Sequence, residues 1–491
     1  MPDNDNNNDE RELPKPEEVT STTHHSITLD GRTLNYTVTA GTLIIQDEEE
    51  EEGKAQGQKA KAEIFYVAYA LDDADPAERP LTFSFNGGPG SSSVWLHLGV
   101  LGPRRVEMAD ETGHMPRPPF RLVDNDFTLL DKSDLVFIDP VSTGYSRAVP
   151  GEKPKEFHGF EKDLESVAEF IRLYTTRAGR WGSPKFLIGE SYGTTRAAGL
   201  AGVLQGKMGM YLNGVMLVST ILNFQTAYFN PGNDLPYILF LPTYTATAHY
   251  HGQLAPELQE RPLEDVLEEV EEWAMTDYTL ALMQGADLPE EAREEVVERL
   301  ALYTGLSEAY IRRTAQRIEI FRFTKELLRE EGRTVGRLDS RFTGVDRDSA
   351  GEMFEFDPSL TAIMGPYTAT LNDYVRRELQ FKSDLPYEIL TSRVRPWNYD
   401  KFQNQYVDVA ETLRRAMNVN PYLRVFVANG YYDLATPYLA TEYTFSHLGV
   451  PRERYEDISM AYYEAGHMMY LHLPSLAQLK EDLADFIDGA L

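Results

Sequence analysis

The sequence predicts an α/β fold in which a mostly parallel sheet, covered by helices on both faces, is interrupted by a helical insertion. Short apolar strand patterns recur at 81–85, 135–139, 185–188 and 215–220. Helical patterns such as 160–177 separate them, and parallel strands need such crossover helices. Between residues 221 and 417 strand patterns almost vanish and long helical patterns take their place. We therefore expect a core of residues 25–220 and 418–491, with residues 221–417 forming a helical cap.

The beginning of the chain predicts a tail and an edge hairpin. Residues 1–24 are polar and acidic, which favours a disordered tail. Alternating strand patterns follow at 25–29 and 33–39 and predict a hairpin at the edge of the sheet. The acidic run 47–52 is expected to be a solvated hairpin loop, because adjacent like charges repel one another.

Composition narrows the class of protein. With 491 residues, of which 42% are hydrophobic, the chain can bury a large core. A net charge of −31 disfavours nucleic acid as a partner, and no apolar run is long enough to predict a membrane span. The absence of cysteine excludes disulfides and thiolate metal sites.

The first residues lack the apolar region of a signal peptide, so the cytoplasm is favoured over the periplasm or secretion. Composition leaves the oligomeric state open.

Residues 189–193 read Gly-Glu-Ser-Tyr-Gly, directly after the apolar run 186–188 and before a helical stretch of small residues. This context is typical of a nucleophile elbow, in which a serine stands at a sharp turn between a strand and a helix. Glycine is needed on both sides because a side chain would collide in the turn. The motif predicts that Ser191 is a nucleophile.

A nucleophilic serine needs a base and a carboxylate that orients it. Asp433 follows the predicted buried strand 424–429, and His467 lies in a short loop before the last helix. Alone, each would more often be a turn residue or a structural group. Their appearance in the order Ser191, Asp433, His467 predicts a catalytic triad and an α/β-hydrolase fold, and it does not fit the chymotrypsin or subtilisin order.

A glycine-rich run, Asn-Gly-Gly-Pro-Gly at 86–90, follows the first predicted core strand. It could be a flexible connector, but acyl transfer needs backbone N–H groups aimed at the oxyanion. We expect Gly88 and Tyr192 to supply them. A phosphate loop is disfavoured because the Gly-Lys-Ser/Thr tail is missing. No cofactor or metal site is predicted, since the histidine pairs lack a third ligand at suitable spacing.

Together these residues resemble the serine carboxypeptidases, and the chain is similar to a bacterial-type member because it has no cysteine. Five separated motifs carry the resemblance: 86–90, 139–146, 189–193, Asp433 and 466–468. The resemblance implies an exopeptidase that acts on peptides with a free C-terminus. It also implies that Asn86, Gly87 and Glu190 bind the C-terminal carboxylate of the substrate.

One departure from the family pattern concerns this anchor. Val100 stands where many eukaryotic relatives have a second glutamate that shares a proton with the one before the nucleophile. Two carboxyls in contact keep one of them neutral, and a neutral carboxyl can donate a hydrogen bond to a carboxylate. Without the partner, Glu190 can be held neutral only by burial or by another acid. We expect a weaker anchor and an activity range less confined to acidic pH.

The sequence thus predicts a serine-type carboxypeptidase that works through an acyl-enzyme. An esterase or lipase, or an acyltransferase, would share the same triad. A catalytically silent binding protein is a further alternative. Asn86 and Glu190 favour a substrate that bears a carboxylate.

Overall fold

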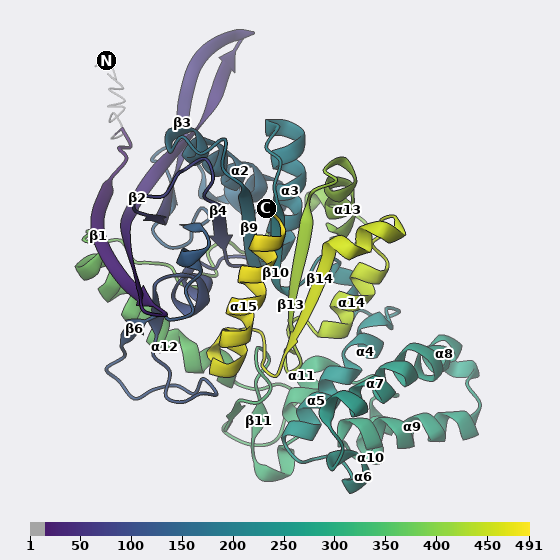
Figure 1. The fold of residues 1–491 in the computed structure, drawn as a ribbon. Coiled ribbons are helices and arrows are strands. Elements are labelled where there is room, and N and C mark those ends of the chain that lie inside the picture. Colours follow the sequence, from purple (N-terminus) through teal and green to yellow (C-terminus); the bar gives the residue numbers. More distant parts are fainter. Residues whose placement is uncertain (1–14) are drawn as a thin grey trace, which may run out of the picture.

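The structure, a computed structural model, describes residues 15–491. A ten-stranded sheet forms its centre, in the order β1-β2-β3-β7-β4-β9-β10-β13-β14 with β8 paired to β3 (Figure 1). The strands are β1 (Thr20–Leu29), β2 (Arg32–Glu51), β3 (Lys54–Leu71), β4 (Leu81–Phe85), β7 (Asp134–Ile138), β8 (Arg147–Ala148), β9 (Lys185–Ser191), β10 (Gly214–Thr220), β13 (Arg424–Gly430) and β14 (Ile458–Tyr463). From β7 to β14 neighbouring strands are parallel, whereas β1, β2 and β3 pair antiparallel and β3 joins β7 antiparallel.

Alternate residues of the central strands feed two hydrophobic cores, one on each face of the sheet. In β9, Phe186 and Ile188 belong to the core that includes α15, while Leu187 belongs to the core that includes α2 and α3. The covering helices are α1 (Val94–Leu96), α2 (Phe160–Arg177), α3 (Tyr192–Met208), α12 (Pro358–Asp373), α13 (Ala410–Val419), α14 (Tyr438–Ser446) and α15 (Leu473–Gly489). Burial on both faces explains why these strands read as continuous apolar runs.

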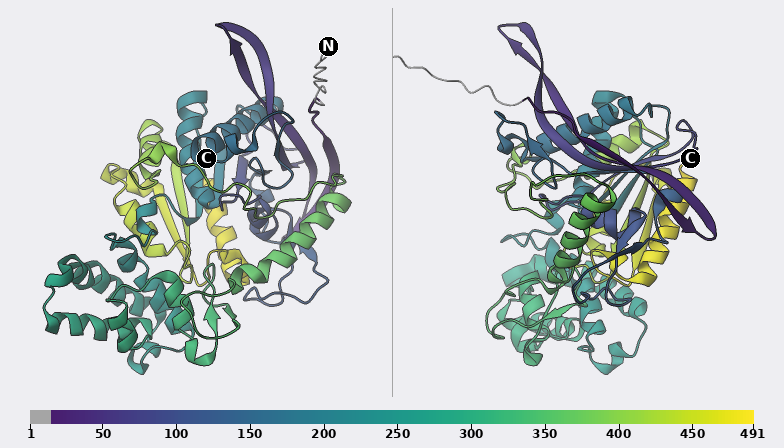
Figure 2. Two further views of the ribbon diagram at one scale, coloured as in Figure 1. Left: turned by 180° about the vertical axis from the view of Figure 1, so that it is seen from behind. Right: turned by 90° about the vertical axis from the view of Figure 1, so that its left-hand side faces the viewer.

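Two expectations at the start of the chain need correction. Of the predicted tail 1–24, residues 1–14 lie outside the described residues. The rest is not all tail, because β1 begins at Thr20 and pairs along its whole length with β2. The acidic run 47–52 is not a loop, because β2 continues to Glu51 and the turn follows at once. Lys59 and Lys61 on β3 form ion pairs with Glu49, which offsets the repulsion within the run. This hairpin extends beyond the helices (Figure 2).

The insertion divides into two parts. Its first part is a helical lobe beside one end of the sheet (Figures 1 and 2), and its hydrophobic cluster also includes residues between 432 and 440, after β13. The helices of this lobe are α4 (Leu235–Leu239), α5 (Leu241–Tyr250), α6 (Pro256–Gln259), α7 (Leu263–Trp273), α8 (Thr279–Gln284), α9 (Glu290–Thr304), α10 (Glu308–Arg313) and α11 (Ile320–Glu326). Its second part contains the short strands β11 (Thr334–Val335) and β12 (Thr343–Gly344), and its helix α12 packs into the core of the sheet. The helix α13 packs against α3, so the second part of the core begins at Ala410, earlier than the predicted residue 418.

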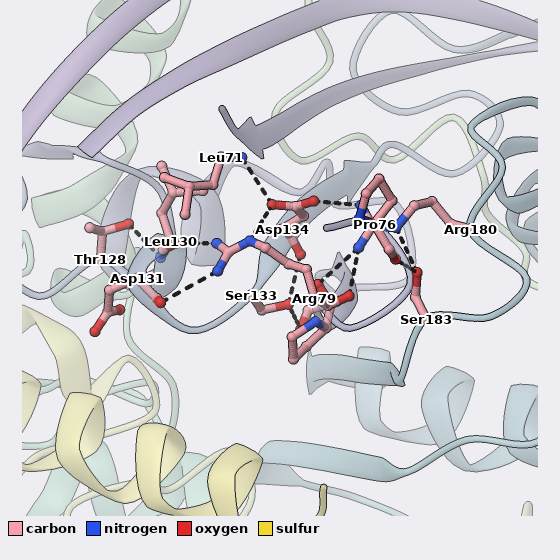
Figure 3. Close-up of polar contacts among 12 residues, drawn as sticks. Leu71, Pro76, Arg79, Thr128, Leu130, Asp131, Ser133, Asp134, Arg180 and Ser183 are labelled. Atoms are coloured by element: carbon pink, nitrogen blue, oxygen red, sulfur yellow. Dashed lines mark hydrogen bonds and ion pairs between the residues drawn. The ribbon is translucent and has the colours of Figure 1, made fainter. Parts of the chain in front are cut away.

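A buried polar cluster closes the end of the sheet at which β7 begins (Figure 3). The carboxylate of Asp134 accepts hydrogen bonds from Arg79 Nε at 2.7 Å and Arg180 Nη1 at 2.5 Å. The backbone N–H of Leu71 donates to the same carboxylate at 3.0 Å. Each of the three charged side chains is less than 10% exposed. One carboxylate therefore balances two buried guanidinium groups.

We expect the substitution Asp134→Ala to lower the free energy of unfolding by about 3–5 kcal/mol, because it leaves two buried arginines without their counter-ion. Urea unfolding followed by tryptophan fluorescence would measure the change. Asp124→Ala is the matched control: Asp124 pairs with Arg104 but is 67% exposed, so its loss should change the free energy by about 1 kcal/mol or less. Equal losses in the two variants would contradict the assigned role of the cluster.

Candidate active site

Ser191 stands at the turn between β9 and α3, as the motif predicts. Its backbone has φ 60° and ψ −129°, a conformation that side-chain-bearing residues adopt only under strain. The flanking glycines leave no room for a side chain. An added Cβ at Gly189 would lie 2.1 Å from the carbonyl oxygen of Gly193, and one at Gly193 would lie 2.8 Å from that of Phe85. The strained turn therefore depends on glycine at both positions.

His467 and Asp433 are brought together from the loops that follow β14 and β13. The imidazole Nδ1 lies 2.7 Å from Oδ2 of Asp433, and both side chains are buried. The carboxylate of Asp433 also accepts hydrogen bonds from the N–H of Ala435 and from the N–H and hydroxyl of Thr436, at 2.6–3.0 Å. Burial disfavours a charged imidazole, but the carboxylate of Asp433 outweighs it and raises the pKa of His467. Ser191 and His467 line the same cavity.

A segment of the insertion, residues 337–341, holds both of these loops. The carbonyl oxygen of Leu338 accepts a hydrogen bond from the N–H of His467 at 2.6 Å. The carbonyl oxygen of Arg337 accepts one from the N–H of Leu434 at 3.1 Å. The Asp433 loop and the His467 loop are thus fixed to one strip of backbone, which we call the strut (residues 337–341).

The strut is itself held by a buried ion pair. Arg341 Nη2 donates to Asp339 Oδ2 at 2.7 Å, and the N–H of Gly466 donates to the same oxygen at 3.1 Å. Arg341 Nη1 donates to the carbonyl of Glu464 at 2.9 Å, and its guanidinium lies over the ring of Tyr432. Sequence analysis missed these residues, because no local pattern links a strip of the insertion to two distant loops.

The cavity has a volume of about 370 Å³ and is open at one side. Its described lining residues are Asn86, Gly87, Gly88, Pro89, Ser91, Trp95, Glu190, Ser191, Arg337, Leu338, Asp357, Leu360, Ile363, Leu390, Thr391, Ser392, Arg395, His467 and Met468. Among these, none comes from the helices α4–α11. The predicted cap therefore contributes to the cavity only through its second part, residues 337–395.

Tyr192 follows Ser191 directly in the chain, and Gly88 lines the same cavity as Ser191. An added Cβ at Gly87 would lie 2.4 Å from the nitrogen of Tyr192, so the glycine-rich loop and the start of α3 are in direct contact. Within residues 15–491, neither amide donates a hydrogen bond to another group. Two free N–H groups beside a nucleophile can stabilise a developing oxyanion.

A buried arginine fixes this contact. Arg196 on α3 pairs with Asp163 on α2, and its Nη1 donates to the carbonyl oxygen of Asn86 at 2.5 Å. The guanidinium lies over the rings of Phe85 and Tyr192. One side chain thus ties the glycine-rich loop to the helix that begins at the nucleophile.

Asn86 and Glu190 lie side by side in the cavity and keep polar atoms free. Asn86 Oδ1 accepts a hydrogen bond from the N–H of Leu96, whereas the buried Asn86 Nδ2 lies beside Glu190, whose charged form it favours, without a well-formed hydrogen bond to any described residue. Oε2 of Glu190 accepts a hydrogen bond from the hydroxyl of Tyr470 at 2.5 Å. An unpartnered buried amide is costly and indicates a group that a ligand completes.

Burial raises the pKa of Glu190 to about 7, although His467 and the hydroxyl of Tyr470 favour its charged form. Below pH 7 the carboxyl is therefore mainly neutral and can donate a hydrogen bond. Since Tyr470 already donates to Oε2, the proton of the neutral carboxyl belongs on Oε1. Burial thus supplies the neutrality for which the sequence offered no acidic partner.

Tyr470 is the residue that sequence analysis missed at this anchor. Val100 is buried in the hydrophobic core and brings no polar group. The neighbouring Gly99 makes room for aromatic rings instead: an added Cβ there would lie 2.3 Å from Tyr470 and 3.0 Å from the hydroxyl of Tyr367. The position of Tyr470 three residues after His467 was the available signal, but only the structure shows that its hydroxyl reaches Glu190.

Comparisons with known proteins agree with this arrangement. The sequence profile of the serine carboxypeptidase family matches residues 48–471, which is most of the chain. This chain belongs to the serine carboxypeptidase family. The family assignment made from the five motifs is thereby confirmed.

Individual relatives are distant. Serine carboxypeptidase-like 5 and serine carboxypeptidase-like 2 of Arabidopsis thaliana are each 28% identical over 140 residues, which is 28% of this chain and 30% of either relative. The crystal structure of Kex1Δp, a prohormone-processing carboxypeptidase from Saccharomyces cerevisiae, is similar with a TM-score of 0.55 and 17% identity. That match covers 92% of this chain and 91% of Kex1Δp, and it confirms the predicted α/β-hydrolase fold. In the described part of the chain, no helix is both long and apolar enough to cross a bilayer.

The pH dependence of substrate binding tests the anchor. We expect KM for a peptide with a free C-terminus to be flat below about pH 7 and to rise above it, because a charged Glu190 repels a carboxylate. Tyr470→Phe removes a donor that favours the charged form of Glu190, so the pH above which KM rises should be higher in this variant. At pH 6 KM should also rise, since the carboxyl proton is no longer confined to Oε1. Steady-state kinetics from pH 5 to pH 9 would measure both effects.

Tyr463→Phe is the matched control for this experiment. The hydroxyl of Tyr463 donates to Asp482 at 2.6 Å, and neither residue lines the cavity. This variant also loses a hydrogen bond between tyrosine and a carboxylate, but its KM should begin to rise at the same pH as in the unmodified protein. If KM of Tyr470→Phe began to rise at the same pH as in the unmodified protein, Tyr470 would not set the pKa of Glu190.

Proposed function

We propose that this protein is a serine-type carboxypeptidase that releases the C-terminal amino acid of peptides through an acyl-enzyme. One observation carries the proposal: Glu190 and Ser191 are consecutive residues that line the same cavity. A substrate carboxylate bound at Glu190 and Asn86 therefore lies one residue away from the carbonyl that Ser191 attacks. This spacing suits the last peptide bond of a chain.

In the proposed reaction, His467 takes the proton of the Ser191 hydroxyl as its oxygen attacks the last peptide carbonyl. Asp433 holds Nδ1 of the imidazole and stabilises the charge that His467 gains. The N–H groups of Gly88 and Tyr192 stabilise the oxyanion. His467 then protonates the departing amino group, which breaks the C–N bond and leaves an ester on Ser191. Water, deprotonated by His467, hydrolyses that ester.

The same proposal assigns the substrate carboxylate to Asn86, Gly87 and Glu190. Asn86 Nδ2 makes no well-formed hydrogen bond to a described residue and lies beside Glu190, Gly87 lines the cavity, and neutral Glu190 can donate from Oε1. An esterase, a lipase or an acyltransferase would use the same triad but has no need of this anchor. A silent binding protein has no need of the strain at Ser191. The anchor is therefore the feature that favours a carboxypeptidase over these alternatives.

Comparing an N-blocked dipeptide that has a free C-terminus with its C-terminal amide tests the proposal. We expect kcat/KM to be higher for the free acid, because the amide is uncharged and offers the anchor one acceptor oxygen where the carboxylate offers two. Ser191→Ala should lower kcat by about 10⁴-fold to 10⁶-fold. Ser446→Ala, at an exposed serine outside the cavity, should leave kcat unchanged. Equal rates on acid and amide, or near-normal turnover by Ser191→Ala, would disprove the proposal.

A further inference from the structure

Two arginines line the cavity although the chain has a net charge of −31. Arg337 is half-buried in the strut, and Arg395 is exposed on the second part of the insertion. In the described residues, neither guanidinium forms an ion pair or donates a hydrogen bond. By contrast, Arg341 in the same strut is paired with Asp339. The cavity thus contains cationic groups without internal partners.

The acid next to Arg337 is already engaged by other donors. Asp357 caps the N-terminus of α12, and its Oδ1 accepts hydrogen bonds from the N–H groups of Arg337 and Ser359 at 3.2 and 3.0 Å. The hydroxyl of Ser359 donates to the same oxygen at 2.5 Å. The positive end of the helix further offsets this carboxylate. The guanidinium of Arg337, which lies beyond ion-pair distance of Asp357, remains available to an anion from solution.

The position of Arg337 relative to the anchor indicates which part of a substrate it would meet. The wall that carries Asp357 continues along α12 through Leu360 and Ile363, both of which line the cavity. One turn further, Tyr367 packs against Gly99 together with Tyr470, the partner of Glu190. The same helix therefore runs from Arg337 to the carboxylate anchor.

A residue whose α-carboxylate is bound at Glu190 would have this wall beside its side chain. Leu360, Ile363 and Met468 would contact its methylene groups, and Arg337 lies beside Asp357 at the start of α12. Guanidinium binds carboxylate through paired, charge-assisted hydrogen bonds, which are strong where water is partly excluded. The arrangement fits a side chain that is apolar near its backbone and negative at its tip.

We propose that this cavity selects peptides whose C-terminal residue is acidic, with Arg337 binding the side-chain carboxylate. Arg395, at the exposed side of the cavity, adds attraction for the same group. This inference rests on the proposed carboxypeptidase function and names its substrate class. Glutamate has one more methylene group than aspartate to lie along the apolar wall of Leu360 and Ile363.

The test compares kcat/KM for N-blocked dipeptides with a free C-terminus: Phe-Glu, Phe-Gln, Phe-Leu, Glu-Phe and Gln-Phe. Phe-Glu and Phe-Gln have nearly the same shape and differ in charge. We expect Phe-Glu to exceed Phe-Gln by about tenfold to a hundredfold, the effect of one charge-assisted hydrogen-bonded pair. Added salt should reduce this ratio, since it screens the partly exposed arginines.

Arg337→Gln should bring the ratio of Phe-Glu to Phe-Gln close to one. The ratio is the informative quantity, because Arg337 also acts on His467 and its loss can alter turnover of every substrate alike. Arg393→Gln is the matched control: Arg393 is an exposed arginine near Arg395 that pairs with Glu388 and does not line the cavity. This control should keep the ratio of the unmodified protein.

Four results would overturn the inference. A ratio of one or less in the unmodified protein would exclude an acidic preference. A preference seen only for Glu-Phe over Gln-Phe would show that the acid is recognised in the residue before the C-terminal one. Equal losses on Phe-Glu, Phe-Gln and Phe-Leu in Arg337→Gln would show that Arg337 does not recognise the side-chain carboxylate. If none of the five dipeptides were cleaved, the carboxypeptidase proposal would be wrong as well. If Phe-Leu were cleaved but no acidic preference were seen, only the inference about acidic residues would be wrong.

Discussion

The structure of the site depends on one steric constraint, the close approach of the backbone at the ends of β4 and β9. Gly87, Gly189 and Gly193 come so near to neighbouring main-chain atoms that a methyl group at any of them would collide. This approach allows the chain to turn sharply at Ser191, and it places the free N–H of Tyr192 beside the glycine-rich loop. It also puts Glu190 and Asn86, the residues just before the two turns, into the same cavity. The proposed nucleophile, oxyanion donors and carboxylate anchor therefore arise from a single packing arrangement.

The other half of the site depends on the insertion. The strut holds the loops of Asp433 and His467 by backbone hydrogen bonds, and a buried ion pair between Asp339 and Arg341 fixes the strut. The two loops are also bonded to each other, by the N–H groups of Tyr431 and Tyr432, and the hydroxyl of Ser219 donates to the carbonyl oxygen of His467. The insertion thus does more than cover the cavity: its second part completes the support of the predicted base and its orienting acid. The helical lobe α4–α11 stands apart from the described lining of the cavity.

Local motifs allowed the sequence to predict the sheet and the centre of the site. The strand patterns at 81–85 and 215–220 match β4 and β10 to within a residue, because strands buried on both faces give continuous apolar runs. The proposed triad residues and the proposed anchor residues Asn86 and Glu190 could be named from the sequence because each belongs to a motif with its own turn chemistry. Tyr470 and the strut could not be found this way, since their roles arise only from contacts between segments far apart in the chain. The acidic run 47–52 was misread for the same reason: the lysines that offset it lie on the opposite strand.

The charge of the whole chain and the charge of the cavity lead to different expectations for ligands. At physiological salt, charges more than about 8 Å apart are largely screened, so the acidic exterior has little influence on a group bound inside the cavity. There, burial keeps Glu190 neutral below about pH 7, and the carboxylate of Asp357 is engaged by backbone donors. The cations that line the cavity are the guanidinium groups of Arg337 and Arg395, while the hydrogen bonds to Asp357 fall on its Oδ1. A cavity built this way can accept a negatively charged chain end even though the molecule as a whole is strongly acidic.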